Sequence, residues 1–293
     1  MSYIDDIRKI NTLKFEDIVE ISKNPVPDRY KSEPWKYVDS HGGHSLRRGT
    51  AVLETEEQCC AYITAYGQMH YHKLMRALDD NEFPYSALNN GIEIYDWGCG
   101  QGIGTLAIIE KLQQKGLLGN LHKVTLEEPS DIERSRAVLH VRKALDGYNV
   151  NIIDIPQYLP SDYGDDTKSI TSIEVEQPYA IHIFSNILDI ETVSLKGVSK
   201  LITSSGQRHI VLCIGPANPN GSRINDFCNY FKENKIHVFT DFKETYFGIL
   251  PNKHIYGCLI KSFSYDLSQN IDILYEYKYF APVQFFAAYA EKI

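Results

Sequence analysis

The sequence of 293 residues lacks several patterns that would define a class of protein at once. It has no window of about 18 consecutive apolar residues, the minimum for a helix that crosses a membrane. Its first ten residues, MSYIDDIRKI, lack the apolar segment of a secretory signal peptide. We therefore expect a cytoplasmic protein that makes no use of a membrane.

The cysteines are also few and form none of the spacings of common metal sites. The chain has six, at positions 59, 60, 99, 213, 228 and 258, and no CxxC pair occurs among them. A zinc ribbon requires such pairs, and a clustered iron site requires closely spaced thiolates. We therefore predict no metal site, and unpaired thiols in a chain without a signal fit a reducing compartment.

Basic residues are outnumbered, with 30 Lys and Arg against 38 Asp and Glu, for a formal net charge of −8. Proteins that bind duplex nucleic acid draw much of their affinity from positive charge facing the phosphates. The acidic balance therefore disfavours a large nucleic acid as a partner, although it does not exclude one, since a local basic patch could bind it. The hydrophobic content of 43% is enough to bury a substantial core.

From residue 91 onward, short apolar runs alternate with helical patterns. The predicted strands are residues 92–97, 123–127, 150–154, 179–184 and 209–215. The predicted helices between or after them are residues 102–115, 131–145 and 221–234. This alternation is typical of a doubly wound α/β fold, a mostly parallel sheet with helices on both faces.

The two ends of the chain have different patterns. Residues 1–54 are predicted to be an irregular extension, because the segment before Thr55 is polar and rich in Pro and Gly. Thr55, followed by Glu56 and Glu57, is a good helix start and predicts a helical segment over residues 55–90.

Near the C-terminus, the runs at 236–242 and 255–263 have no convincing helix between them and predict an antiparallel hairpin at the end of the sheet. With this hairpin the predicted sheet has seven strands. The predicted domain spans residues 91–293, and residues 1–90 form an N-terminal extension that is helical in its second part.

The most informative segment is IEIYDWGCGQGIGT, in which an apolar strand ends at Asp96. Four glycines follow at alternate positions, and then a helical pattern begins. Glycine lets the backbone turn sharply and approach a ligand closely, and a helix start directs free N–H groups toward it. A dinucleotide fingerprint would need G-x-G-x-x-G, but counting from Gly98 or Gly100 places Ile103 or Thr105 at the last position.

This segment resembles motif I of the class I S-adenosylmethionine-dependent methyltransferases, which have a Rossmann-like fold. In that family the glycine turn contacts the amino-acid half of the cofactor. The resemblance covers about residues 90–263 and implies that S-adenosyl-L-methionine is the cofactor. The cofactor-binding residues that it implies in this turn are Asp96, Gly98, Cys99, Gly100, Gly102, Gly104 and Thr105.

A pair of acids follows the second strand, as in the second motif of the family. Glu127 and Glu128 lie 23 and 24 residues beyond Gly104. The resemblance implies that one of them accepts hydrogen bonds from the two ribose hydroxyls, and we favour Glu128 because it directly precedes Pro-Ser. An acid cluster at a helix start would also stabilise the helix dipole without any ligand.

The ends of the third and fourth strands supply further candidates. By resemblance, Asp154 would receive the adenine amino group and Ile155 would stack on the ring, although Ile155 could equally be a core residue. Ser185 and Asn186 would face the methyl group or the acceptor, at the crevice lip where open α/β sheets bind ligands. Asn186 could instead cap a helix at 187–190.

The helical segment before the sheet supplies the remaining candidates. Members of the family commonly cover the cofactor with such a helix. His70 could act as a base toward an acceptor, and Tyr66 lies one turn before it on the predicted helix. The alternative is that Tyr66 packs in the core and His70 is an ordinary surface residue.

The predicted function is thus S-adenosylmethionine-dependent methyl transfer to an unidentified acceptor, with Asn186, His70 and Tyr66 as candidate catalytic residues. A small molecule or a protein is favoured as acceptor, then RNA, with DNA last, because no N/D-P-P-Y/F motif follows the fourth strand and no Pro-Cys dipeptide occurs. A homo-oligomer is left open. The alternative function is a non-catalytic binding or assembly module with the same fold.

Overall fold

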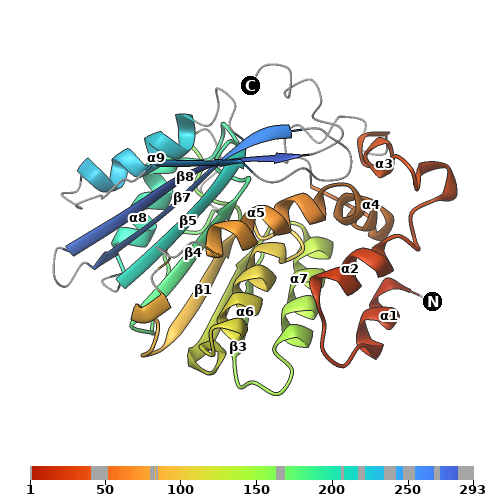
Figure 1. Cartoon of the computed structure of the whole chain (residues 1–293), viewed down its shortest axis with the longest axis horizontal. Helices are drawn as coiled ribbons and strands as arrows, with labels where there is room; N and C mark the ends of the chain where they lie inside the picture. The colour runs from red at the N-terminus through yellow and green to blue at the C-terminus, as the bar shows by residue number, and fades with distance from the viewer. Residues whose placement is uncertain are drawn as a thin grey trace.

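The computed structural model describes residues 2–40, 52–79, 83, 85–162, 169–205, 208–216, 222–233, 242–246, 255–266 and 271–282. Within them, one sheet runs through the molecule and helices cover both of its faces (Figure 1). The five parallel strands that the sequence predicts are present and differ from the predicted bounds by at most two residues. They are β1 (Ile92–Trp97), β2 (Leu121–Glu127), β3 (Asn151–Ile155), β4 (Tyr179–Ser185) and β5 (Arg208–Pro216).

The parallel strands lie in the order β3-β2-β1-β4-β5. The chain first builds outward from β1 through β2 to β3, then returns to the other side of β1 for β4 and β5. The connections of β1 and β4 therefore leave the sheet in opposite directions, and a crevice opens at the carboxyl ends of these strands. Open α/β sheets bind their ligands at this switch point.

Alternating side chains of β1 explain why both faces of the sheet are covered. Ile92 and Ile94 pack into one hydrophobic cluster, whereas Tyr95 and Trp97 pack into another. Helices α6 (Ile103–Gln114) and α7 (Asp131–Ala144) close the first cluster, and α8 (Leu195–Thr203) and α9 (Ser222–Glu233) close the second (Figure 1). Strands buried on both faces are continuous apolar runs, which is why the sequence predicts them well.

The N-terminal extension corrects one prediction, because residues 3–40 are largely helical rather than irregular. The helices are α1 (Tyr3–Lys9), α2 (Phe15–Ser22), the 3-10 turn η1 (Asp28–Tyr30) and α3 (Pro34–Ser40). Each of the first two buries a short apolar stripe, such as Tyr3 and Ile7 in α1. Helices of seven or eight residues are marginal alone and form here because they pack on α6 and α7.

The predicted helix start at Thr55 is confirmed. The Thr55 hydroxyl accepts a hydrogen bond from the Gln58 amide, and the Gln58 side chain accepts one from the Thr55 amide. The helix consists of α4 (Glu56–Tyr62), a π-helical turn η3 (Ile63–Gly67) and α5 (Gln68–Leu78). Short 3-10 turns η4 (Tyr85–Ala87) and η5 (Leu118–Asn120) precede β1 and β2.

The C-terminal part of the sheet differs from the predicted hairpin. Three strands extend the sheet beyond β5: β6 (Phe242–Tyr246), β7 (Ile255–Asp266) and β8 (Ile271–Pro282). Strand β7 is antiparallel to both β5 and β8, and β6 pairs in parallel with β8 instead of with β7. The described sheet therefore has eight strands rather than seven, and most of the predicted strand at 236–242 lies outside the described residues.

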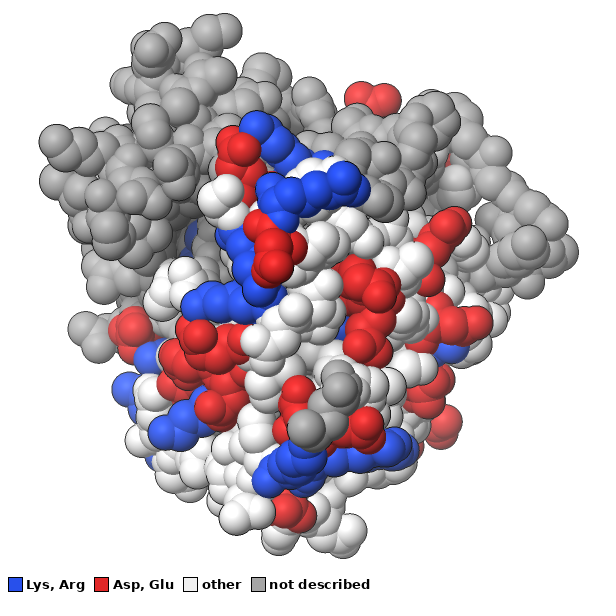
Figure 2. Space-filling model, turned by 90° about the vertical axis from the view of Figure 1, so that its right-hand side faces the viewer, with Lys and Arg blue, Asp and Glu red and all other residues white. Residues whose placement is uncertain are grey.

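The face that carries the N-terminal helices has mixed charge (Figure 2). Lys and Arg side chains alternate there with Asp and Glu, and several form ion pairs three residues apart, such as Lys9–Asp6 and Lys36–Glu33. On this face the described residues form no broad basic surface for a phosphate backbone. Across the described parts of the chain, no helix is both long and apolar enough to cross a membrane.

Candidate functional site

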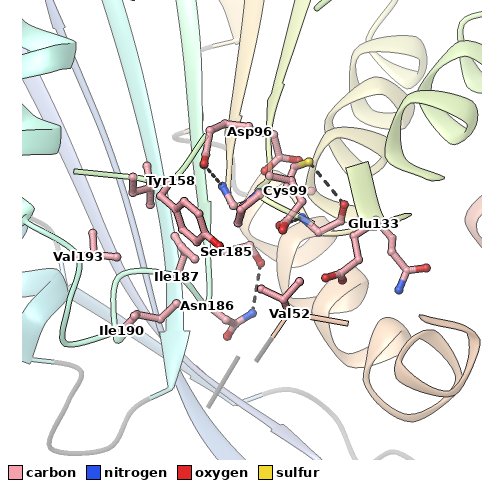
Figure 3. Close-up of a pocket in the computed structure, with 18 of the residues that line it drawn as sticks. Val52, Asp96, Cys99, Glu133, Tyr158, Ser185, Asn186, Ile187, Ile190 and Val193 are labelled. Atoms are coloured by element: carbon pink, nitrogen blue, oxygen red, sulfur yellow. Dashed lines mark hydrogen bonds between the residues drawn. The ribbon is translucent and has the colours of Figure 1, made fainter. Parts of the chain in front are cut away.

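A cavity of about 520 Å³ lies at the switch point of the sheet. The ends of β1, β2 and β4 form its floor, and α4, α5 and the first turn of α7 contribute side chains to its walls. Figure 3 shows Asp96, Cys99 and Glu133 on one side of it and Tyr158, Ile187, Ile190 and Val193 on the other. The lining residues that matter most below are Tyr62, His70, Asp96, Gly98, Gly100, Glu127, Glu128, Glu133, Ser185 and Asn186.

The glycine turn after β1 borders the cavity, and its glycines have no side chains that would occupy it. Gly98 and Gly100 have φ angles of 59° and 51°, in the left-handed region that favours glycine. A Cβ on Gly98 would lie 2.6 Å from Ile187 Cδ1, so this glycine is required by packing. In the part of the chain that the structure describes, a Cβ on Gly100 would have a single neighbour within 4 Å, Glu133 Oε1 at 3.6 Å, so it would extend into the space above the turn.

Asp96 anchors the start of α6 from beneath the turn. Its Oδ2 accepts hydrogen bonds from the Thr105 amide at 3.0 Å and from the Thr105 hydroxyl at 2.8 Å. Burial raises the pKa of Asp96 to about 7, against the two hydrogen bonds from Thr105. A Cβ on Gly104 would lie 3.0 Å from the same carboxylate, so the small residue lets the helix approach the strand.

The two acids after β2 reach back to the glycine turn. Glu127 Oε2 accepts from the Gly98 amide at 2.8 Å, and Glu128 accepts from the amides of Gly100 at 3.0 Å and Ser130 at 2.8 Å. Burial raises the pKa of both carboxyls, that of Glu127 to about 8. The second oxygen of Glu127, Oε1, is buried without a hydrogen-bond partner, which is costly unless a ligand supplies one.

A third acid, Glu133, joins them from the first turn of α7. It is 8% exposed and lines the cavity beside Gly100. Burial, followed by the charge of Glu128, raises its pKa to about 8, while a hydrogen bond from the Leu53 amide and the charge of Arg136 act in the opposite direction. The side of the cavity nearest the turn is therefore lined by four carboxyl groups.

The opposite wall carries a hydrogen-bonded chain of four side chains from distant parts of the sequence. Lys73 Nζ lies 3.3 Å from Asn186 Oδ1, Asn186 Nδ2 lies 2.7 Å from His70 Nδ1, and His70 Nε2 lies 3.3 Å from the Tyr62 hydroxyl. An ammonium group can only donate, so the Asn186 atom that faces Lys73 must be its oxygen. The Asn186 amide group then donates to His70 Nδ1, and the proton of a neutral His70 lies on Nε2.

This order of donors restricts what His70 can do. Burial and the charge of Lys73 lower the pKa of His70 well below its ordinary value of 6.5, so the ring is neutral at pH 7. Its basic nitrogen, Nδ1, is occupied by the Asn186 amide group. His70 is therefore a half-buried donor to Tyr62, neither an ordinary surface residue nor a base with a free lone pair.

The π-helical turn explains how Tyr62 and His70 reach the same cavity. Eight residues of α-helix rotate a side chain by about 800°, which leaves the two residues roughly 80° apart around the axis. A π turn inserts one residue, so the effective rotation is about 700° and the two side chains come within roughly 20° of each other. The π turn at Ile63–Gly67 lies between them.

Ten of the predicted site residues line the cavity together. They are His70, Asp96, Gly98, Cys99, Gly100, Gly104, Glu127, Glu128, Ser185 and Asn186. Five others do not. Thr105 and Gly102 support the turn from behind, where a Cβ on Gly102 would lie 3.2 Å from Ala137. Tyr66 contacts Tyr62 with its ring tilted by 41° and does not line the cavity.

The prediction that Asp154 and Ile155 contact the adenine finds no support in their positions. The Asp154 side chain is 52% exposed and pairs with Arg134 at 3.2 Å. Neither residue lines the cavity, because β3 is the edge strand and lies one strand farther from the switch point than β2. Tyr158 and Leu159, a few residues further along, reach the cavity instead.

The alternative reading of Asn186 as a helix cap is wrong. Residues 187–190 form turns rather than a helix, and the φ angle of Asn186 is 58°, whereas a helix cap has an extended backbone. The backbone N–H of Asn186 donates to the Ile214 carbonyl, which fixes the residue at the end of β4. This left-handed conformation in a non-glycine residue turns the side chain toward His70.

Sequence reasoning missed Tyr62, Glu133, Tyr158 and the apolar residues of the β4–α8 connection. Glu133 follows the capping residue Ser130 by three positions, a pattern that predicts only a favourable charge at a helix start. Tyr62 lies on one face of a helical pattern, which by itself indicates packing rather than a binding role. Only the aromatic residue after β3, Tyr158, gave a usable signal, because ligand contacts in this architecture follow strand ends.

Comparison with known proteins adds a remote likeness of structure. No protein-family model matches the sequence, and no curated protein matches it. Magnesium protoporphyrin IX methyltransferase from Synechocystis PCC 6803, solved with bound S-adenosylmethionine, is 16% identical over 66% of this chain and 81% of its own, with a TM-score of 0.35. A SAM-dependent methyltransferase from Leishmania major is 12% identical over 74% and 80%, with a TM-score of 0.34. Similarity this remote does not assign the chain to a family.

Proposed function

We propose that the cavity binds S-adenosyl-L-methionine and that the chain transfers the cofactor's methyl group to an acceptor in the same cavity. The carrying observation is the turn after β1: Gly100 leaves open space above its backbone, and the buried oxygen of Glu127 beside it has no partner. A ligand with hydroxyl groups, which both donate and accept, would fill the space and satisfy that oxygen in either protonation state. S-adenosyl-L-methionine, the cofactor that the motif resemblance implies, is such a ligand.

The cavity walls suggest which part of the cofactor each would hold. The glycine turn would face the amino-acid half, and the acids at 127 and 128 would face the ribose. Glu128 remains the first candidate for the ribose, because two backbone amides hold its carboxylate in place and each oxygen keeps a lone pair. The apolar side chains of Leu159 and Ile187 offer surface for the adenine ring.

When bound, the cofactor supplies an activated methyl group on a sulfonium, so the chain itself needs to align the reactants and exclude water. Tyr62, His70 and Asn186 form the wall nearest an arriving acceptor. Because the basic nitrogen of His70 is occupied, we expect these residues to orient the acceptor by hydrogen bonds rather than to take a proton from it. Tyr66, whose ring lies tilted against that of Tyr62, supports this wall from outside.

A small molecule or a protein segment is the favoured acceptor, and the mixed charge of the face in Figure 2 gives no reason to prefer a nucleic acid. Residues 55–90 would act as a lid, since Tyr62 and His70 reach the cavity from this segment. The second candidate is a cofactor-binding module without transfer activity. The absence of a free base in the Tyr62–His70–Asn186 wall is the observation that favours it.

Calorimetry on the full chain tests the proposal. S-adenosylhomocysteine, the demethylated product, should bind with a Kd in the micromolar range, or about −8 kcal/mol. Binding of NADH in its place would refute the assignment. Incubation with methyl-labelled cofactor and fractionated small molecules, peptides and RNA then separates the two candidates, because the module would bind the cofactor and label nothing.

A further inference from the structure

The carboxyl group of Glu133 has no counterpart in the motifs that point to the cofactor. It enters the cavity from α7, and its Oε1 lies 3.6 Å from the position of a Cβ on Gly100, directly beside the open space above the turn. It does not hold the turn, because the amides of Gly98 and Gly100 are already bonded to Glu127 and Glu128. Its position makes Glu133 a wall of the ligand space.

Among the described residues, no Lys or Arg forms an ion pair with Glu133, and the two arginines of its helix have other partners. Arg136, on the same helix, donates to Cys60 Sγ at 3.3 Å and its guanidinium lies 3.5 Å from the ring centre of Tyr3, so its charge lowers the pKa of Glu133 without forming an ion pair with it. Arg134, which is buried, pairs with Asp131 and Asp154 and donates to the Glu128 carbonyl. Within the described parts of the chain, the buried Oε1 of Glu127 also has no hydrogen-bond partner, an independent sign that a polar group is missing beside it. Together these features favour a ligand group that donates to Glu133.

We propose that Glu133 binds the α-ammonium group of the cofactor's amino-acid half, an inference that rests on the proposed function. The glycine turn is where that half would lie, and Glu133 is the carboxylate that borders the space above Gly100 without being engaged to the turn. The charged pair would form in a buried site, where a hydrogen bond between ions is stronger than in water.

Three compounds distinguish the contributions of the cofactor's two positive charges to binding. S-adenosylmethionine has both a sulfonium and an ammonium, S-adenosylhomocysteine has only the ammonium, and 5′-methylthioadenosine has neither. Glu133→Gln removes the charge and keeps the size. We expect it to raise the Kd of the first two compounds by about tenfold or more, by the same factor, and to leave 5′-methylthioadenosine unchanged.

Asp131→Asn is the matched control. It removes the same charge from the first turn of α7, but the Asp131 side chain is 89% exposed and faces solvent. It should leave all three affinities unchanged. An increase confined to S-adenosylmethionine would place Glu133 at the sulfonium and overturn the inference, as would an equal increase for all three compounds. If the unmodified protein binds none of them, the proposed function fails instead.

Proton release provides a second measurement. The groups that face Glu133 are Cys59 and Tyr62 from α4, Cys99 from the turn, Glu128 after β2 and Arg136 from its own helix. Its pKa of about 8 leaves much of it protonated at pH 7. Pairing with an ammonium would ionise it, so binding of S-adenosylhomocysteine should release a proton, seen as a dependence of the binding heat on buffer. Equal proton release by Glu133→Gln would contradict the inference.

Discussion

Adding one methyl group at Gly100 should weaken ligand binding while lowering stability only modestly. Gly100→Ala places a Cβ where, among the described residues, only Glu133 Oε1 lies within 4 Å, at 3.6 Å, so these residues can accommodate it. The cost to folding is that of a left-handed alanine at φ 51°, about 1–2 kcal/mol. The same methyl group would lie inside the ligand space, and one extra methyl in a packed site costs about 1–3 kcal/mol.

The binding cost corresponds to a rise of about 5- to 150-fold in the Kd of S-adenosylhomocysteine. Gly116→Ala is the matched control, because Gly116 has a φ of 70° and a Cβ there would have no neighbour within 4 Å. It lies at the end of α6, away from the cavity. Both variants should lose similar stability, and only Gly100→Ala should lose affinity.

Denaturant unfolding and calorimetry on the same preparations give the two quantities. Equal affinity of the two variants would show that the ligand does not approach Gly100, and would refute the reading of the turn as a binding surface. A much larger loss of stability in Gly100→Ala than in Gly116→Ala would show that the space above the turn is not open.

Three further predictions concern the charged groups of the cavity. Glu128→Gln should raise the Kd of S-adenosylhomocysteine more than Glu127→Gln, and the reverse order would reassign the ribose partner. The free energy of unfolding should fall from pH 6.5 to 8.5. The carboxyls of Glu127 and Glu133 are ionised above their ordinary pKa of 4.5 in the unfolded chain but stay protonated up to about 8 when folded, so stability is lost as pH rises through that window, by up to about 2 kcal/mol per group. The buried histidines, whose folded pKa is lowered from 6.5, add no pH dependence above pH 6.5, because they are neutral there in both states. If Glu133→Gln left the slope of unfolding free energy against pH unchanged, the raised pKa assigned to Glu133 would be contradicted. Nitrogen NMR should find His70 neutral and protonated at Nε2 from pH 8 to 5.5, whereas Lys73→Met should raise its pKa; a His70 that titrates near 6.5 in the unmodified protein would rule out the proposed order of donors.

The strands show how much of the fold can be predicted from the sequence. Ile92–Trp97 and Tyr179–Ser185 are buried on both faces, so most of their residues are apolar, and glycine or polar residues follow them in the chain. Helix α1 has only Tyr3 and Ile7 to bury, and a stripe that short does not rise above the polar pattern around it. Its stability comes from α7, which lies more than a hundred residues away.

The candidate site divides in the same way. The turn from Asp96 to Thr105 was predictable, because left-handed glycines, a strand end and a helix start are all encoded in consecutive residues. Glu133, Tyr62 and the chain from Lys73 through Asn186 to His70 were not, since the last joins side chains 113 and 116 positions apart. The sequence by itself determined the backbone that can approach a ligand, while the tertiary structure decided which charges surround it, because burial and pairing depend on what packs opposite and not on what comes next.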